Sequence, residues 1–359
     1  MEITGQQPVR VKPTMAVGDR VVGPDQACFV VAEIGNNHDG SLDQALELIE
    51  AASLAGADAV KFQTFKASRL VSEQPVAPPS LWRDAKQRSW QEVFLEWELP
   101  RQWHERLAAA AADHDVVFFS TAFDPDSVDF LESVGVQLHK IASFEITYSD
   151  LLKKVASTGK PLLLSTGAST LDEVSEALQL LEGAGCGPVA LLHCGSCYPL
   201  AVEDVNLRAM STLARKFNRP VGYSDHTLGT ETTLAAVALG ACVIEKHFTL
   251  NKNLPGPDHA VSMEPEELKA MIASIRRVEA ALGSEEKKPV AAEAGARSEG
   301  RRSLHAARDI TAGSVITEED VTVVRPAAGI APRDKEKIMG LRTRSAMASG
   351  QPITWSDLR

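Results

Sequence analysis

Eight short β-rich runs alternate with helical segments along most of the chain, and this alternation restricts the possible folds more than any other feature. The runs are CFVVAEIG (28–35), AVKFQTF (59–65), VVFFSTAF (116–123), LHKIAS (138–143), PLLLSTG (161–167), VALLHCG (189–195), VGYSDHT (221–227) and CVIEKHFT (242–249). Neighbouring parallel strands need a crossover, usually a helix, to return the chain. Eight such units predict an α/β fold with a (β/α)8 TIM barrel. An open doubly wound sheet is the alternative, although no G-x-G-x-x-G follows the first run.

The segments between the runs have the spacing of amphipathic helices. SLDQALELIEAASLAG (41–56) begins at Ser41, a candidate N-cap, and carries leucine and isoleucine at intervals of three and four residues. The segments at 171–185 and 264–283 follow the same pattern and end in glycine. The segment 66–100 is long and irregular for a barrel loop. Because it follows the second strand, we expect it to lie over the active face.

The chain beyond the last barrel helix predicts a second, smaller domain. Residues 284–300, SEEKKPVAAEAGARSEG, are polar, alanine-rich and unpatterned, which indicates a linker after a barrel domain of residues 1–283. Residues 301–359 contain short strands and turns, and a domain of this size is marginally stable alone.

Composition excludes several classes of protein. The formal net charge of −11 gives no electrostatic support to nucleic-acid binding. No apolar run approaches the ~18 residues of a membrane span. The opening MEITGQQPVRVKPT lacks the apolar core of a signal peptide, so a cytoplasmic location is expected. Five cysteines, an odd number, argue against a disulfide framework, and Cys194-x-x-Cys197 has no second C-x-x-C to complete a zinc site.

Ionisable and hydroxyl side chains gather where the predicted strands end, which in barrel enzymes is the catalytic face. They are Glu33, Asn36, Asn37, His38, Lys61, Gln63, Ser120, Thr121, Lys140, Ser143, Glu145, Cys194, Ser196, Tyr198, Ser224, His226, Glu245 and His247. Residues two apart on a strand share a face, so several of these point into the barrel mouth together. Buried ionisable groups are costly, and a metal with an anionic substrate would account for so many of them.

His226 and His247 are candidate metal ligands. A lone histidine is ordinarily structural, but adjacent parallel strands lie ~4.8 Å apart, close enough for two histidines to share one ion. Two imidazoles leave coordination positions open, as catalysis requires, and they suit Mn, Fe, Co or Zn better than Mg. Lysines and hydroxyls nearby would hold a small anion such as a phosphate.

Seven stretches of the chain resemble motifs of the sialic acid synthase family. They are 31-VAEIGNNHDGSLDQA-45, 60-VKFQTFKA-67, 139-HKIASFE-145, 192-LHCGSCYPLAVEDVNL-207, 222-GYSDHTLG-229, 244-IEKHFTL-250 and 255-PGPDHAVSMEP-265. Residues 301–359 resemble the small antifreeze-like SAF domain, a β-clip, that these enzymes carry. The resemblance implies a transferase of the N-acetylneuraminate synthase type, which condenses phosphoenolpyruvate with N-acetylmannosamine or a related N-acyl aminosugar and releases phosphate. Legionaminate or pseudaminate synthase and N-acylneuraminate-9-phosphate synthase remain alternatives.

The resemblance also implies roles for individual residues. Those that match the family's phosphoenolpyruvate cradle are Lys61, Thr121, Lys140, Ser143 and Ser224. Those that match groups around the sugar and the reacting carbons are Glu33, Gln63, Tyr198, Glu245 and Asp258, of which Glu33, Tyr198, Glu245 and Asp258 are the catalytic candidates. His226 and His247 match the ligands of a divalent metal, most often Mn²⁺, with Mg²⁺ or Co²⁺ also possible. Arg325 matches an arginine that the SAF domain lends to the other subunit of a domain-swapped homodimer.

Three positions depart from the family pattern. Ser196 stands where several members have an asparagine that contacts the phosphate, and a serine offers one donor instead of two. Ala142 replaces a usual glycine, and Asp39 replaces a usual asparagine. These changes leave the chemical set intact but bear on which sugar is used.

Two other functional classes stay open at this point. A Schiff-base aldolase would use Lys61 or Lys140 as its nucleophile and would need no metal. A non-catalytic binding module is conceivable from the C-terminal domain, but it would leave the strand-end residues unexplained.

Overall fold

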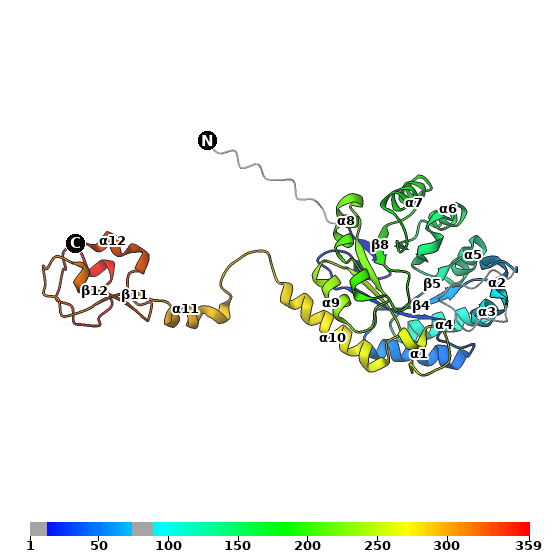
Figure 1. Cartoon of the computed structure of the whole chain (residues 1–359), viewed down its shortest axis with the longest axis horizontal. Helices are drawn as coiled ribbons and strands as arrows, with labels where there is room; N and C mark the ends of the chain where they lie inside the picture. Colours follow the sequence, from blue (N-terminus) through cyan, green and yellow to red (C-terminus); the bar gives the residue numbers. More distant parts are fainter. Residues whose placement is uncertain (1–12, 74–88) are drawn as a thin grey trace. The chain divides into compact units, whose positions relative to one another are not determined.

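The computed structural model describes residues 13–73 and 89–359. Its contacts divide the chain into two compact units, residues 1–283 and 284–359 (Figure 1).

Eight parallel strands close into a barrel in the order β10-β3-β4-β5-β6-β7-β8-β9, which confirms the predicted TIM barrel and excludes the open sheet. The strands are β3 (Phe29–Gly35), β4 (Ala59–Thr64), β5 (Val117–Ala122), β6 (His139–Ile141), β7 (Leu162–Ser165), β8 (Val189–Cys194), β9 (Val221–Asp225) and β10 (Val243–His247). Each lies within one of the eight β-rich runs. The pairing of β3 with β4 shifts register between Glu33 and Gly35.

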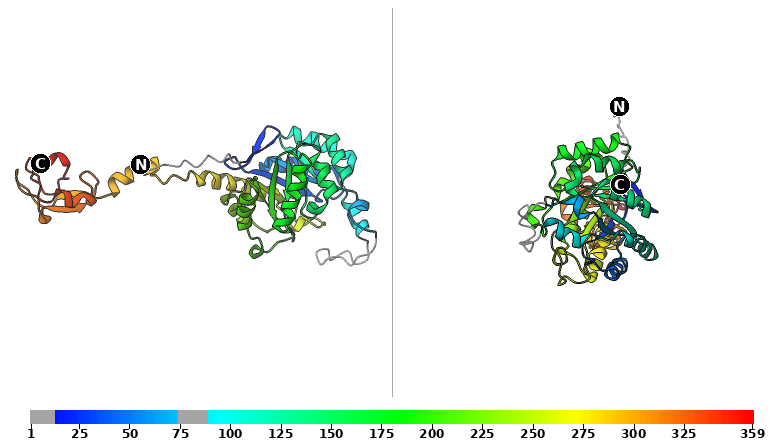
Figure 2. Two further views of the ribbon diagram at one scale, coloured as in Figure 1. Left: turned by 90° about the horizontal axis from the view of Figure 1, so that it is seen from above. Right: turned by 90° about the vertical axis from the view of Figure 1, so that its right-hand side faces the viewer.

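Helices surround the barrel (Figure 2). The main ones are α1 (Leu42–Ala55), α4 (His104–Asp113), α5 (Pro125–Val134), α6 (Ser149–Ala156), α7 (Leu171–Gly183), α8 (Arg208–Phe217), α9 (Glu231–Ala238) and α10 (Pro265–Leu282). The hydroxyl of Ser41 accepts from the N–H of Gln44, so Ser41 caps α1 as expected, and Gly56 ends that helix in the left-handed region. The apolar faces of the helices bury against the outward-facing residues of the strands and form the larger core.

The inside of the barrel has an apolar half and a polar half. Phe29, Phe119 and Leu163 belong to a second core at the N-terminal half of the strands. This core includes Met15 and Val22 from a hairpin, β1 (Met15–Val17) and β2 (Arg20–Val22), that the sequence analysis did not predict. The hairpin thus closes this end of the barrel, and the polar strand ends lie at the other.

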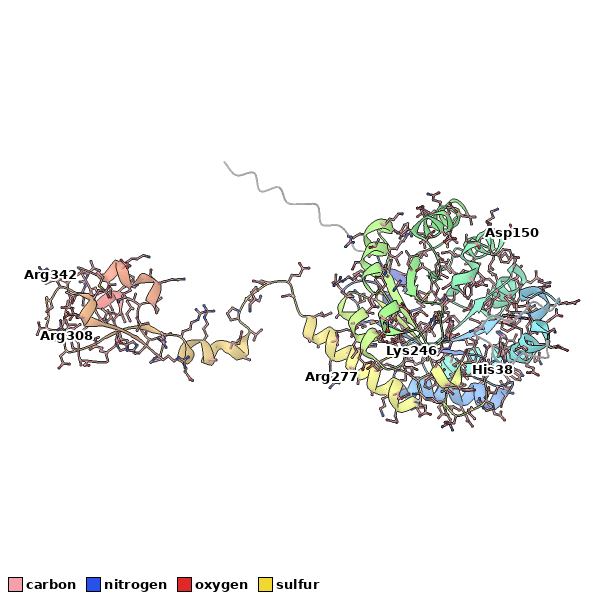
Figure 3. All side chains as sticks on the ribbon, viewed as in Figure 1. His38, Asp150, Lys246, Arg277, Arg308 and Arg342 are labelled. Atoms are coloured by element: carbon pink, nitrogen blue, oxygen red, sulfur yellow. The ribbon has the colours of Figure 1, made fainter. Side chains whose placement is uncertain are left out.

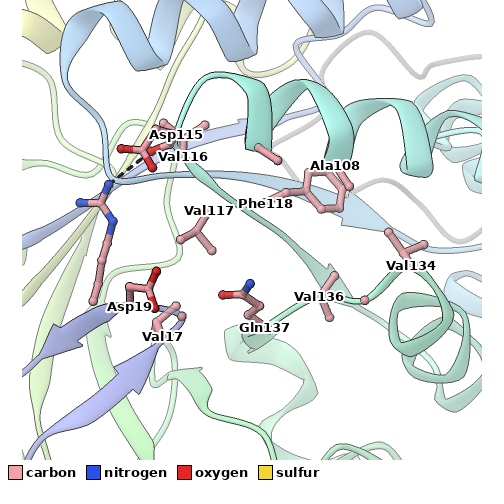
Figure 4. A pocket seen from close by; sticks show the side chains of 14 residues that line it. Val17, Asp19, Ala108, Asp115, Val116, Val117, Phe118, Val134, Val136 and Gln137 are labelled. Carbon is pink, nitrogen blue, oxygen red and sulfur yellow. Dashed lines mark hydrogen bonds between the residues drawn. The ribbon is translucent and has the colours of Figure 1, made fainter.

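A cavity of about 450 Å³ lies beside the hairpin (Figure 4). Its lining includes Val17, Val117, Phe118 and Gln137, as well as Arg20, which donates to the backbone oxygen of Asp115. These residues lie in the hairpin, at the start of β5 or just before β6, so the cavity is on the opposite end of the barrel from the predicted site.

The segment 66–100 is more regular than predicted where it is described. It contains α2 (Ala67–Leu70) and α3 (Trp90–Trp97), and Ser89 and Glu92 form a capping box that starts α3. Phe94 packs edge-on against Phe65, which follows β4, so α3 is held beside the C-terminal end of that strand. Residues 74–88 of the predicted loop lie outside the described residues.

In the second unit, the predicted linker is partly helical, because α11 (Ala294–Gly300) follows a single turn at 291–293. Alanine favours a helix even without an apolar stripe, which explains why the pattern missed it. The remaining residues form the expected short strands and turns around a small core, with β11 (Ser303–Ala306) antiparallel to β12 (Val321–Val324). Among the described residues, none of the helices is both long and apolar enough to cross a bilayer.

Candidate active site

Lys61 is the centre of a buried polar layer at the C-terminal ends of the strands. Its ammonium lies 2.7 Å from Glu33 Oε2 and 3.8 Å from Glu245 Oε1, and it donates to Thr121 Oγ1 at 3.1 Å. Ser224 donates to Glu245 Oε1 at 2.9 Å. These five residues come from β3, β4, β5, β9 and β10, and each residue is 5% exposed or less. The period-two pattern of the strands therefore brings together the residues that it predicted would share the mouth.

The ionisable groups in this layer have pKa values shifted in different directions. Burial lowers the pKa of Lys61, but Glu245 and Glu33 outweigh burial and raise it, so the ammonium stays charged. Burial raises the pKa of Glu245, but Lys61 and Lys140 reverse this and hold it below its ordinary value. The pKa of Glu33 stays raised, because burial and the neighbouring Glu245 outweigh Lys61. Of the two carboxyl groups beside Lys61, Glu33 is thus the one that retains a proton more readily.

Lys140 lies on β6 in a different setting. Its Nζ donates to Ser165 Oγ at 2.6 Å and to the backbone oxygen of Ile141 at 3.0 Å, both of which are neutral. Burial lowers its pKa, and the nearby ammonium of Lys61 lowers it further. An anion bound at this position would raise the pKa of Lys140 again and favour its charged form. Ser165 was missed by the sequence analysis, although it ends the run PLLLSTG as hydroxyls end several other strands.

Three loops meet around Gly167, which follows β7. Its N–H donates to Ser143 Oγ at 3.0 Å, and Ser143 lies 3.2 Å from the sulfur of Cys194. A Cβ on Gly167 would come within 2.6 Å of Ser196 Oγ, 2.8 Å of Ser143 Oγ and 2.9 Å of Cys194 Sγ. Only a glycine leaves this space open, and the sequence analysis did not single it out. The result is a small polar cradle formed by the loops after β6, β7 and β8.

His226 and His247 lie side by side, with ring centroids 5.5 Å apart. Nδ1 of His226 donates to the backbone oxygen of Gly195 at 2.6 Å, which leaves the lone pair on Nε2 because a carbonyl only accepts. Nδ1 of His247 is buried without a hydrogen-bond partner. Burial lowers the pKa of both, so both imidazoles are neutral, the form that binds metals. The ring of Tyr198 packs against both imidazoles, with centroid-to-centroid distances of 4.2 Å to His226 and 5.6 Å to His247.

The described residues contain no larger metal cluster. In the described part of the chain, no group of three or more His, Cys, Asp or Glu side chains is arranged to hold an ion. The two neutral imidazoles, one with a buried unpaired nitrogen, still fit a metal that takes its remaining ligands from substrate and water.

Asp258 reaches the site from the loop after β10. Its Oδ2 lies 3.6 Å from His247 Nδ1. Burial, with the neighbouring Glu33, raises the pKa of Asp258 to about 7. Gln63 donates to Glu33 Oε1 at 2.9 Å, and Gly35, which has a positive φ, lacks the Cβ that would crowd Glu33, Gln63 and Asp258. Asp258 therefore joins the Lys61 layer to the histidine pair.

Of the predicted site residues, Arg325 alone lies in the other unit, where it is exposed directly after β12. The remaining ones lie at the C-terminal ends of the barrel strands or in the loops that follow them.

Comparisons with known proteins agree with this picture over nearly the whole chain. The NeuB family model matches residues 48–287, and the SAF domain model matches residues 301–359. The chain is 45% identical to an N,N'-diacetyllegionaminic acid synthase of Legionella pneumophila, over 94% of this chain and 96% of that protein. It is 35% identical to the human N-acetylneuraminate-9-phosphate synthase, over 89% of this chain and 90% of that one. A solved N-acetylneuraminic acid synthetase from Leptospira borgpetersenii, in complex with citrate, superposes with a TM-score of 0.71 at 33% identity, covering 79% of this chain and 95% of that one.

Proposed function

The chain belongs to the NeuB family, and from that premise we propose that it condenses phosphoenolpyruvate with an open-chain N-acyl aminosugar, forming a nine-carbon keto acid and releasing phosphate. One observation carries the proposal. Two buried lysines and two neutral imidazoles occupy the same end of a closed barrel, with carboxyl groups between them. This set offers cations for an anionic donor, neutral ligands for a metal and groups for proton transfer.

A diacetylated aminosugar is the acceptor that the comparisons favour. Identity to the legionaminic acid synthase is 45%, against 35% for the human N-acetylneuraminate-9-phosphate synthase. The N-acetylmannosamine that the resemblance first implied is the principal alternative. Ser196, which replaces the amide expected there, lies beside Gly167 with Ser143 and Cys194, where we infer that the phosphate binds. It therefore bears on the donor more than on the acceptor.

Phosphoenolpyruvate would lie across the two lysines. Lys61 is held charged by Glu33 and Glu245, while Lys140 donates to two neutral oxygens and gains most from an anion. The hydroxyls of Ser143 and Ser196 open onto the Gly167 cradle and can donate to phosphate oxygens. Thr121 and Ser224 complete the polar wall through their contacts with Lys61 and Glu245.

His226 and His247 would hold the divalent cation, for which Mn²⁺ is the first candidate. When bound there, such an ion acts as a Lewis acid that polarises the aldehyde of the open-chain sugar. The fixed tautomer of His226 and the unpaired nitrogen of His247 support this assignment. Tyr198 would shield the histidine pair from solvent by packing on both rings.

Proton transfer falls to the carboxyl groups with raised pKa values. As carbon 3 of phosphoenolpyruvate bonds to the aldehyde carbon, the aldehyde oxygen gains a proton. Water then adds at carbon 2 and loses one proton, and its second proton passes to the departing phosphate as the C–O bond breaks and the carbonyl forms. Asp258, whose pKa is about 7, can exchange protons near neutral pH, and Glu33, whose pKa is also raised, is the second candidate. Glu245 remains ionised, since the neighbouring lysines hold its pKa low, and it balances the charge of Lys61.

A second copy of the chain would cover the mouth of the barrel. Large apolar side chains are exposed on the loops after β6, β8 and β9: Phe144, Tyr148, Tyr198, Val202 and Leu228. Clustered exposed apolar groups mark interaction sites. In the SAF unit, Val324 and Arg325 are exposed side by side and offer an apolar contact and a cation. We therefore infer a homodimer in which each SAF unit serves the barrel of its partner.

The decisive experiment is a substrate panel. The full chain is supplied with Mn²⁺ and phosphoenolpyruvate, and each acceptor is tested separately: N-acetylmannosamine, its 6-phosphate, and the diacetamido sugars that precede legionaminic and pseudaminic acids. Products are identified by mass and phosphate is measured. We expect ¹⁸O from water in the keto acid and none in the phosphate. If none of the acceptors in the panel leads to phosphate release, the condensation is refuted. If only N-acetylmannosamine is turned over, the diacetylated acceptor is refuted.

A further inference from the structure

Directly behind the histidine pair lies a buried ion pair that the proposed chemistry does not use. Asp225 ends β9 and Lys246 lies one residue before the end of β10, and the two are register partners. Lys246 Nζ is 2.9 Å from Asp225 Oδ2, and their side chains are 1% and 0% exposed. Side chains alternate along a strand, so both point away from the barrel interior that Ser224 and Glu245 face. Figure 3 shows Lys246 within the barrel unit, whereas Arg277 is on its surface.

Asp225 is the acceptor of an extensive set of hydrogen bonds. Its Oδ1 accepts from the N–H and the hydroxyl of Thr227, both at 2.8 Å, and from Tyr223 at 3.1 Å. Its Oδ2 accepts from Thr233 at 2.6 Å and from Thr232 at 3.0 Å, both on α9. The carboxylate thereby ties the end of β9 to the helix that follows it.

Both members of the pair form hydrogen bonds with the backbone of Thr227, the residue that follows His226. Thr227 donates its N–H to Asp225, and its backbone oxygen accepts from Lys246 Nζ at 2.6 Å. His226 thus lies between Asp225, which belongs to the buried pair, and Thr227, which is hydrogen-bonded to both of its members. His247 directly follows Lys246 on β10. The pair therefore contacts the backbone beside His226 and directly precedes His247.

Stability alone does not account for this arrangement. Dehydrating two charges costs about as much as their attraction returns, and well-packed apolar side chains often replace a buried pair without loss. Packing between a barrel and its helices needs no charge. What the pair adds is a fixed geometry for Thr227, which an apolar pair would leave unspecified.

We propose that Asp225 and Lys246 are positioning residues that hold His226 and His247 at the spacing needed to share one divalent cation. The inference rests on the proposed function, in which that pair binds the metal. Outer residues that orient metal ligands typically change affinity ~10–100-fold when they are lost.

The test is Mn²⁺ binding to the chelator-stripped full chain without substrates, measured from the paramagnetic resonance signal of free Mn²⁺. The double variant Asp225→Asn/Lys246→Met removes both charges at once, so no unpaired charge stays buried. We expect its Kd for Mn²⁺ to rise ~10–100-fold. Its melting temperature in chelator is measured alongside, because a purely structural role would lower the melting temperature and leave the Kd of the folded protein unchanged.

Two threonine variants make the result independent of how well the double variant folds. Thr233→Val removes one hydroxyl donor from Asp225 without a change of charge and should weaken Mn²⁺ binding less, in the same direction. Thr64→Val is the matched control, because Thr64 is a buried hydroxyl on β4 bonded to Ser120 and His104, away from the pair. Its Kd should equal that of wild type.

The outcomes separate this inference from the proposed function. Wild-type affinity in Thr233→Val and in the folded double variant overturns the positioning role and leaves the metal proposal standing. Equal weakening in Thr64→Val overturns it as well, since the effect would then be a general loss of packing. A wild-type protein that binds no Mn²⁺ overturns the metal proposal, and the positioning role falls with it.

Discussion

Lys61 and Glu33 form an ion pair of 2.7 Å inside the barrel, with side chains only 5% and 2% exposed. An isolated buried charge is expensive, so Lys61 depends on Glu33 and Glu245 for its ionisation, whereas Glu33 depends on Lys61 against the opposing charge of Glu245. The pair therefore makes the site a charge-balanced set before substrate arrives. An incoming phosphoenolpyruvate must compete with Glu33 for Lys61, and this competition makes Lys61 the most direct test of how the donor is bound.

Lys61→Met should raise the apparent KM for phosphoenolpyruvate far more than that for the sugar, because a cation that meets the donor is lost. Lys61→Arg keeps the charge and should recover part of the loss. Steady-state kinetics with each substrate varied in turn provide the measurement. A pyruvate adduct on Lys61 or Lys140 after borohydride treatment would instead establish the Schiff-base aldolase.

His226→Ala and His247→Ala should each lower the rate at least ~10²-fold, because each removes half of the protein's ligands for the proposed metal. Chelator should abolish wild-type turnover, and Mn²⁺ should restore it. His114→Ala, at the half-buried C-cap of α4 and outside the site, is the control and should behave as wild type. Full turnover in chelator contradicts the metal proposal.

Gly167→Ala tests the cradle without touching a charge. Its Cβ would lie within 3 Å of Ser143, Cys194 and Ser196, all side-chain atoms that must then move. We expect the KM for phosphoenolpyruvate to rise with little change in that for the sugar. Gly183→Ala, at the end of α7 where a Cβ meets nothing within 4 Å, is the matched control. Unchanged donor kinetics in Gly167→Ala would remove this cradle from the donor site.

Glu145→Gln should change how stability depends on pH. Burial raises the pKa of Glu145 to about 7 from an ordinary value of 4.5, so the folded state binds its proton more tightly than the unfolded state does. The free energy of unfolding therefore falls as pH rises from about 4.5 to 7, by an amount on the order of 1–3 kcal/mol because Glu145 is only partly buried. The glutamine variant lacks this loss.

The melting temperature of Glu145→Gln should thus exceed that of wild type at pH 8 and approach it at pH 5, as measured by thermal unfolding in chelator. Glu203→Gln, at an exposed position, should follow the wild-type curve at both values. A constant difference between Glu145→Gln and wild type across this range would show that Glu145 does not titrate there.

A mixed dimer tests the exchange of SAF units. His247→Ala and Arg325→Ala chains, each inactive alone, are co-expressed. If each barrel takes Arg325 from its partner, one site of every heterodimer joins an intact barrel to an intact arginine, and random mixing restores about a quarter of wild-type sites. If the SAF unit serves its own barrel, every site carries a lesion. Activity no higher than the average of the two variants, with heterodimers demonstrated, rules the exchange out.

The strands and most of the site could be predicted because both follow from periodicity. A parallel barrel strand is buried on both sides, so its apolar run stands out, and a polar residue at its end, such as Glu245, is visible against that run. The hairpin at Met15–Val22 was missed because strands of three residues carry too few alternations. Asp225 and Lys246 were missed for a different reason. They occupy the alternate positions of β9 and β10, where a charge gives no indication of whether it is paired.

Arg325 and Gly167 mark the remaining limits of sequence reasoning. Arg325 was reached through resemblance alone, since no local pattern distinguishes one exposed arginine from another. Gly167 acts by lacking a side chain, and its value lies in the atoms that surround it. The spacing of residues in the sequence predicts neither the role of Arg325 nor the close packing around Gly167.

The hairpin that closes the N-terminal end of the barrel also decides how the protein can be handled. Its turn, at Gly18 and Asp19, is exposed and lies on the face opposite Lys61 and the histidines. An attachment point engineered at Asp19 would anchor the molecule to a sensor surface by its sealed end. The mouth would then face the flowing solution, so that donor, acceptor and metal could each be titrated onto immobilised protein without obstruction from the support.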